Sequence, residues 1–145
     1  MLKKIDITLN NLQDLPLLAI RLALAYGFYE PAIKKVQDIH AIGDWFASLN
    51  IPAPYFQAYL ATGTEILGVV LLTLGLFTRI ISFPLIITMI VAIVTVHWEN
   101  GFSSGDNGFE IPLYYIIMLI TLICFGAGRI SLDHLLIIKN AKSSD

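Results

Sequence analysis

Glu65 is the only charged residue in an otherwise largely apolar run, Tyr59–Phe77. A helix of about 20 apolar residues crosses the hydrocarbon core of a bilayer, so this run is a candidate transmembrane helix. A carboxyl group at that depth costs about 2.5–3.5 kcal/mol on insertion scales, and such residues commonly bind a ligand, carry protons or pair with another helix. We therefore expect Glu65 to meet a specific partner or a ligand.

The neighbours of Glu65 predict which way its side chain points. Helical spacing places four small residues on its face: Ala58, Ala61, Thr62 and Gly68. Small residues mark the places where membrane helices approach one another closely, so this face is expected to turn toward other helices rather than lipid. A structural alternative is that Glu65 joins helices through a hydrogen bond or through an ion pair with Arg21.

His97 lies at the end of the apolar run Ile80–Trp98, just before Trp98, and is expected on the same side of the membrane as Glu65. An imidazole gains and loses a proton near neutral pH, so we predict that Glu65 and His97 exchange protons with a bound molecule. The other polar or aromatic residues expected near this site form the predicted ligand-binding set: Glu30, Lys34, Tyr59, Glu99, Glu110 and Tyr114. The structural alternatives are a Glu30–Lys34 pair one helical turn apart and a place at the rim for Glu99 and Glu110.

The composition is that of an integral membrane protein. Hydrophobic residues make up 57% of the 145 residues and charged residues 14%, with a mean hydropathy of +0.75. Soluble domains carry about 25% charged residues. The net charge of −2 provides no basic surface for nucleic acid. The single cysteine, Cys124, excludes an internal disulfide, and the sequence shows no metal, haem, flavin or nucleotide motif.

These patterns predict an all-α fold, an integral membrane four-helix bundle formed by a single domain over residues 1–145. The spans are expected at about 16–33, 58–77, 80–98 and 111–127. Residues 39–49 carry apolar side chains at helical spacing and predict a short amphipathic helix at the membrane surface between spans one and two. Residues 100–109 read as a loop and 128–145 as a polar cytosolic tail. In span four, Tyr114, Ile117 and Thr121 share the face of Glu110, which is expected to turn inward.

Basic residues predict the orientation of the bundle. If the amino terminus is cytosolic, six fall on that side: Lys3, Lys4, Arg79, Arg129, Lys139 and Lys142. Only Lys34 and Lys35 fall on the other side. Cytoplasmic segments of membrane proteins are rich in lysine and arginine, so both termini are expected in the cytoplasm.

The chain carries a series of short motifs in a fixed order: Arg21, Gly27 and Lys34; Glu65-Ile-Leu-Gly68; Gly75-Leu-Phe-Thr-Arg79; His97, Asn100-Gly101-Phe102 and Gly108-Phe-Glu110; and Gly126-Ala-Gly128-Arg129-Ile-Ser131-Leu-Asp133. Their order and spacing resemble the DoxX family of small four-span bacterial membrane proteins, from about Arg21 to Asp133.

Members of that family include the membrane subunit of thiosulfate:quinone oxidoreductase and proteins linked to oxidative-stress defence. The resemblance implies a multi-pass protein of a bacterial inner membrane. It singles out Glu65, His97 and Glu110, with Arg21 and Arg129, as polar positions, and it gives none of them a catalytic role.

Three functions are compatible with these features. The first is a redox-linked membrane subunit that binds a quinone or a small oxidisable substrate, as a quinone-dependent oxidoreductase or a part of one. The second is a non-enzymatic scaffold for soluble oxidoreductases, and the third is a small solute or lipid transporter. The expected partners are the lipid bilayer, a soluble oxidoreductase and, in a homo-oligomer, further copies of the chain.

Overall fold

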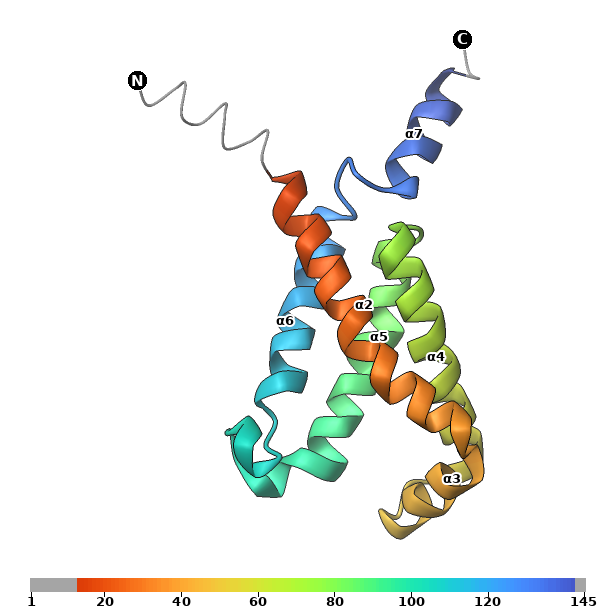
Figure 1. The fold of residues 1–145 in the computed structure, drawn as a ribbon, viewed down its shortest axis with the longest axis vertical. Coiled ribbons are helices and arrows are strands. Elements are labelled where there is room, and N and C mark those ends of the chain that lie inside the picture. The colour runs from red at the N-terminus through yellow and green to blue at the C-terminus, as the bar shows by residue number, and fades with distance from the viewer. Residues whose placement is uncertain (1–12, 143–145) are drawn as a thin grey trace.

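The computed structural model describes residues 13–142, and it contains helices but no β-strand within that range (Figure 1). The helices are α2 (Asp14–Gln37), α3 (Ile39–Ser48), α4 (Pro54–Leu74), α5 (Thr78–Ala92), α6 (Glu110–Phe125) and α7 (Leu132–Lys142). A π-helical turn, η1 (Ile93–His97), and two 3₁₀ turns, η2 (Trp98–Asn100) and η3 (Ser104–Asp106), lie between α5 and α6. Residues 1–15 lack an apolar run and are expected from the sequence to form a short cytosolic lead-in; of these, residues 1–12 lie outside the described part of the chain. The all-helical prediction is confirmed.

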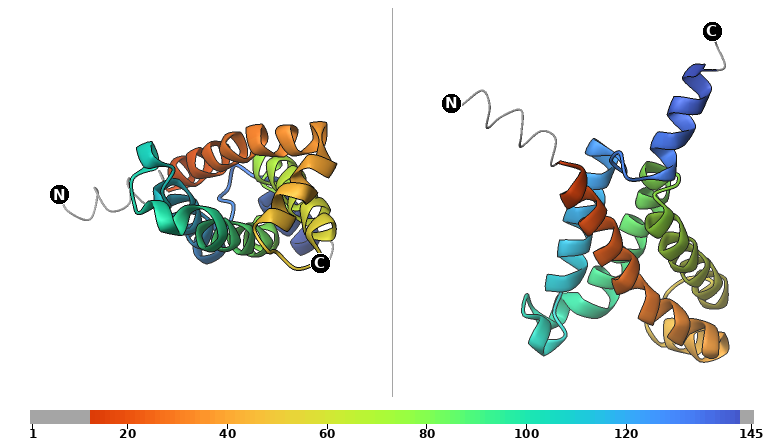
Figure 2. Two further views of the ribbon diagram at one scale, coloured as in Figure 1. Left: turned by 90° about the horizontal axis from the view of Figure 1, so that it is seen from below. Right: turned by 45° about the horizontal axis from the view of Figure 1, so that its top comes forward.

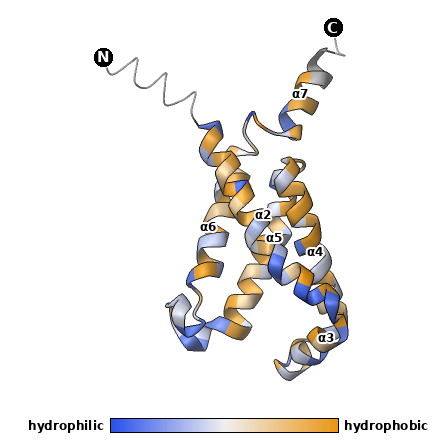
Figure 3. Cartoon of the chain, viewed as in Figure 1, coloured by the Kyte–Doolittle hydropathy of each residue, from blue (hydrophilic) through white to orange (hydrophobic). Residues whose placement is uncertain are grey.

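Two of the described helices are long and apolar enough to cross a membrane, α4 and the continuous helical stretch Thr78–Asn100. Helix α6 is apolar but shorter, with 16 residues, and α2 has 24 residues but carries several charged side chains. Figure 3 shows hydrophobic residues along α4, α5 and α6 and hydrophilic ones gathered toward the two ends of the bundle. The presence of four spans therefore stays a prediction.

The short helix between the first two long helices is present as α3. The Asp38 carboxylate accepts a hydrogen bond from the Ala41 N–H at 2.9 Å and thus caps its start. The Tyr55 hydroxyl donates to Asp44 at 2.5 Å, which ties α3 to the first turn of α4. Pro54 occupies the first turn of α4, where proline is tolerated because its missing N–H has no helical acceptor.

The helices form two pairs, in which α2 packs against α4 and α5 against α6. Figures 1 and 2 show that the pairs lie close together at one end and diverge toward the other. The predicted inward face of α4 is confirmed, since Ala58, Thr62, Glu65 and Gly68 are all buried. We call the closely packed end the clasp end and the diverging end the cleft end.

Arg21 holds the clasp end together. Its side chain is 1% exposed, and its guanidinium group donates hydrogen bonds to the carbonyl oxygens of Leu72 at 3.4 Å and of Ile130 at 2.5 Å. The predicted ion pair of Arg21 with Glu65 is not formed, because Leu72 lies two helical turns beyond Glu65 toward the clasp end. A buried guanidinium that binds two carbonyl oxygens is a structural tie between α2, α4 and the segment before α7.

Asp133 extends this tie to the start of α5. Its carboxylate accepts hydrogen bonds from the N–H groups of Phe77 at 2.8 Å and Thr78 at 3.1 Å, while its own N–H donates to the Gly75 carbonyl at 2.9 Å. Two motifs distant in sequence, Gly75–Arg79 and Gly126–Asp133, are thereby joined. Together with Arg21 they form what we call the clasp.

Within the expected tail, residues 132–142 form helix α7, whose start is capped by the Ser131 hydroxyl accepting from the His134 N–H at 3.2 Å. The expected inward face of α6 is wrong. In α6 the buried residues are Pro112, Leu119 and Leu122, whereas Tyr114 and Ile117 are 46% and 53% exposed. Leu119 and Leu122 therefore form the face of α6 that packs against the other helices.

Candidate functional site

A cavity of about 660 Å³ lies between the two helix pairs at the cleft end. Helices α2 and α4 form one wall, α5, η1 and α6 form the other, and Trp45 and Phe46 of α3 contribute to its lining. The lining is mostly aliphatic and aromatic, with a few polar side chains on both walls. Cavities of this size and character commonly hold small molecules. We call this cavity the cleft.

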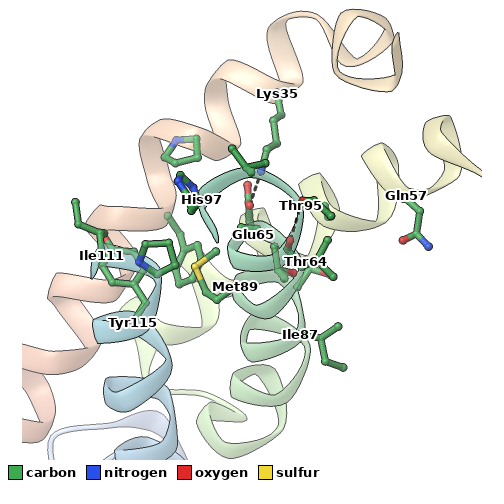
Figure 4. Close-up of a pocket in the computed structure, with 18 of the residues that line it drawn as sticks. Lys35, Gln57, Thr64, Glu65, Ile87, Met89, Thr95, His97, Ile111 and Tyr115 are labelled. Atoms are coloured by element: carbon green, nitrogen blue, oxygen red, sulfur yellow. Dashed lines mark hydrogen bonds and ion pairs between the residues drawn. The ribbon is translucent and has the colours of Figure 1, made fainter. Parts of the chain in front are cut away.

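Glu65 and Lys35 supply the charged groups of the first wall (Figure 4). The Lys35 ammonium lies 2.5 Å from Glu65 Oε1, and the two side chains are 16% and 2% exposed. The second carboxylate oxygen, Oε2, is buried and has no hydrogen-bond partner among the described residues. Buried polar atoms are nearly always hydrogen-bonded. This oxygen is therefore the acceptor in the cleft to which a ligand is expected to donate a hydrogen bond.

His97 lies on the opposite wall, at the end of the π-helical turn. Its Nδ1 is 2.7 Å from the carbonyl oxygen of Asn107. A carbonyl oxygen can only accept, so Nδ1 carries the hydrogen, and Nε2 of the neutral ring is left as an acceptor. Single π-helical turns are rare and often occur at functional sites. This one sets the direction in which His97 leaves the helix.

Tyr115 brings a phenol to the same wall. A Cβ atom on Gly27 would collide with its hydroxyl oxygen, so glycine at this position of α2 leaves the space that the phenol occupies. Its ring packs edge-on against Phe28, with ring centroids 5.3 Å apart. Thr64 and Gln57 add neutral polar groups from α4. The cleft therefore presents hydrogen-bonding groups from both helix pairs, separated by apolar surface.

Both residues predicted to exchange protons, Glu65 and His97, line the cleft. The six residues of the predicted ligand-binding set do not belong to its described lining: Glu30, Lys34, Tyr59, Glu99, Glu110 and Tyr114. Their contact with a ligand stays a prediction.

Several of these six residues have other contacts. Glu30 pairs with Lys34 at 2.6 Å, and both side chains are at least 70% exposed. The Glu110 carboxylate accepts from the Ser104 N–H at 3.0 Å and from the Tyr114 hydroxyl at 3.2 Å, which organises the loop beside the cleft. Tyr59 is 56% exposed on the outer face of α4.

Lys35 and Tyr115 are the site residues that sequence reasoning missed. The buried residues of α2 are Arg21, Leu24, Ala25, Phe28 and Ala32. Continuing the spacing of these buried residues by one turn leads to Lys35. The sequence pattern of α2 could therefore have predicted that Lys35 points inward. Likewise, Tyr115 precedes Leu119 and Leu122 at helical spacing, and counting the leucines as the buried face would have placed it inward.

Comparison with known proteins identifies the family of the chain. The DoxX family model matches residues 16–98, more than half of the chain. A Haemophilus influenzae protein is 34% identical over 83% of this chain and 82% of its own length. A Mycobacterium tuberculosis protein, "Uncharacterized membrane protein Rv3486", is 34% identical over 80% of this chain and 78% of its own.

A further relative carries a functional name. The Bacillus subtilis protein named "Putative oxidoreductase CatD" is 29% identical over 86% of this chain and 90% of its own length. No solved structure matches the chain. The family model covers more than half of the chain, including the helices of the first wall of the cleft, and a relative is named as a membrane protein. This chain is therefore a membrane protein of the DoxX family.

Proposed function

We propose that this protein is a four-span protein of a bacterial inner membrane with both termini in the cytoplasm. The helices at α2, α4, Thr78–Asn100 and α6 supply the four spans. The excess of basic residues at the clasp end supports its placement on the cytoplasmic side. The cleft then opens in the outer half of the bilayer.

We further propose that the cleft binds a quinone or a small oxidisable substrate as part of a redox-linked activity. The observation that carries this proposal is the buried, unpartnered Oε2 of Glu65, which lines a mostly apolar cavity opposite His97. A quinone ring has apolar faces and two oxygens on opposite edges, which suits a cavity with polar groups on both walls. The relative named as an oxidoreductase is consistent with this class of function.

The side chains of the cleft fit the proton chemistry that such a ligand requires. A quinone takes up two electrons and two protons when it is reduced, and the electrons would come from the oxidisable substrate or from a soluble oxidoreductase. For this reduction, Glu65 Oε2 and Nε2 of His97 would each have to carry a proton, which they would donate to the two ligand oxygens at opposite edges. In the reverse direction the two groups, as acceptors, would take the two hydroxyl hydrogens of the hydroquinone while its two electrons pass to the oxidised partner. Lys35 would hold the Glu65 carboxyl group in position through Oε1, and Asn107 would fix the ring of His97 through Nδ1.

Binding of a short-tailed quinone to the detergent-purified protein tests this proposal. We expect saturable binding of its reduced, hydroquinone form that is weakened about tenfold or more in Glu65→Gln and in His97→Ala. The first substitution replaces a charge-assisted hydrogen bond by a neutral one, and the second removes an acceptor in an apolar site. Fluorescence quenching of Trp45, which lines the cleft, provides the measurement. Thermal melting of each variant establishes that it is folded.

Glu30→Gln is the matched control. It also removes one carboxylate, but from an exposed ion pair on α2 outside the cleft lining, so its binding should equal that of the wild type. Equal binding in all variants, or no saturable binding, contradicts the proposal. In that case a pull-down of soluble oxidoreductases with the intact protein tests the scaffold function.

A further inference from the structure

A second cavity, of about 850 Å³, lies at the clasp end. Two arginines, Arg79 and Arg129, line it together with His134. This site is at the opposite end of the bundle from the cleft and shares no residue with it. We call it the basic cavity.

Both guanidinium groups have donors to spare. Arg79 is exposed, and the structure gives its side chain one hydrogen bond, from Nη2 to the Cys124 carbonyl at 3.3 Å. The Arg129 side chain is 69% exposed, and its Nε lies 3.8 Å from the Asp14 carboxylate, beyond normal hydrogen-bond length. A guanidinium group carries five N–H donors in a planar fork that suits phosphate oxygens.

The two carboxylates that line the basic cavity are already engaged by backbone groups. Asp14 accepts a hydrogen bond from the Arg129 N–H at 2.7 Å. Asp133 accepts from the N–H groups of Phe77 and Thr78, as part of the clasp. The two aspartates balance the two arginines in formal charge, so recognition of an anion would depend on the unused N–H donors of the arginines and not on a net positive charge.

Exposed apolar side chains line the same cavity. Phe77, Ile80 and Phe125 are 53%, 66% and 70% exposed, and all three belong to its lining. A soluble phosphate ion would make no use of them, whereas the acyl chains of a lipid would cover them. Basic pockets at the ends of membrane helices are known to hold anionic lipid headgroups.

We propose that the basic cavity binds an anionic phospholipid, with its phosphate held by Arg79 and Arg129 and its acyl chains lying along the three apolar side chains. The cavity lies beside the connection between α4 and α5 and the connection between α6 and α7. A lipid held there would reinforce the clasp from outside. This inference requires the protein to be in a membrane and is independent of what binds in the cleft.

Lipid retention by the intact protein tests the proposal. The wild type, purified in a neutral detergent, is incubated with phosphatidylglycerol or phosphatidylcholine, and the bound lipid is measured by native mass spectrometry. We expect preferential retention of phosphatidylglycerol, weakened about tenfold or more in the double variant Arg79→Gln, Arg129→Gln. If the double variant fails to fold, Arg129→Gln alone is measured instead, because it changes a mostly exposed side chain. It should also weaken the retention of phosphatidylglycerol.

Lys34→Gln is the matched control, because it removes an equally exposed positive charge at the opposite end of the bundle. Its retention of phosphatidylglycerol should equal that of the wild type. Equal retention of the two lipids, or retention that survives loss of both arginines, overturns the proposal. Displacement of the lipid by inorganic phosphate or glycerol phosphate at comparable concentrations also overturns it, since the site would then recognise a soluble anion.

Discussion

Gly75→Ala is expected to lower the free energy of unfolding by about 3–5 kcal/mol. Gly75 has φ +66°, a left-handed conformation that costs an L-residue about 1–2 kcal/mol. A Cβ atom there would also collide with Nη1 of Arg21 and lie 2.6 Å from the Ser131 Cβ. Displacing Arg21 would break its hydrogen bonds to Leu72 and Ile130 and leave the buried guanidinium group without acceptors, at about 1–3 kcal/mol or more, although the Leu72 carbonyl keeps the Gly75 N–H as a donor.

Gly63→Ala is the control for this prediction. Gly63 lies within α4, the helix that Gly75 caps, and a Cβ atom there would meet no other atom within 4 Å. Replacing glycine by alanine within a helix is expected to stabilise it by about 0.5–1 kcal/mol. Thermal and denaturant unfolding in detergent measure both variants. If Gly75→Ala is as stable as Gly63→Ala, the clasp does not hold the bundle as described.

Lys35→Met is the second substitution with a large expected effect. Methionine fills a similar apolar volume but leaves the Glu65 carboxylate buried without its cation. Breaking a buried pair by removing one partner costs about 3–5 kcal/mol. Combining it with Glu65→Gln removes the unpaired charge, so the double variant should recover most of the lost stability.

Lys34→Met is the matched control for Lys35→Met. Lys34 is the adjacent residue of α2, and its pair with Glu30 is largely exposed. Solvent screens such an exposed pair, so this variant should unfold almost as the wild type does. An equal effect of the two substitutions, or no recovery in the Lys35→Met, Glu65→Gln variant, would show that the Lys35–Glu65 pair is not formed.

The part of the fold that could be predicted from the sequence is the part fixed by local pattern. Small residues at helical spacing identified the buried face of α4 around Glu65, and the result is confirmed. The amphipathic helix α3 followed from the same kind of pattern. These features depend on neighbours within a few helical turns, which the sequence displays directly.

The remainder depends on contacts between distant segments. Arg21 donates to Leu72 and Ile130 because of the way α2 crosses α4. The local sequence does not predict the geometry of that crossing. The π-helical turn before His97 is likewise set by packing, since Ile93, Val94 and Val96 would fit an α-helix equally well by pattern. Lys35 was missed because α2 continues one turn beyond its predicted apolar span.

The most direct test of the proposed function is protection of Glu65 from a hydrophobic carbodiimide, which reacts with carboxyl groups that it can reach from an apolar phase. Mass spectrometry locates the label, and Glu65→Gln provides the unlabelled reference. We predict that Glu65 is labelled in the free protein, and that a short-tailed quinone slows this labelling in proportion to its occupancy of the cleft. Labelling at an unchanged rate under saturating quinone would contradict the proposal that the quinone lies against Glu65.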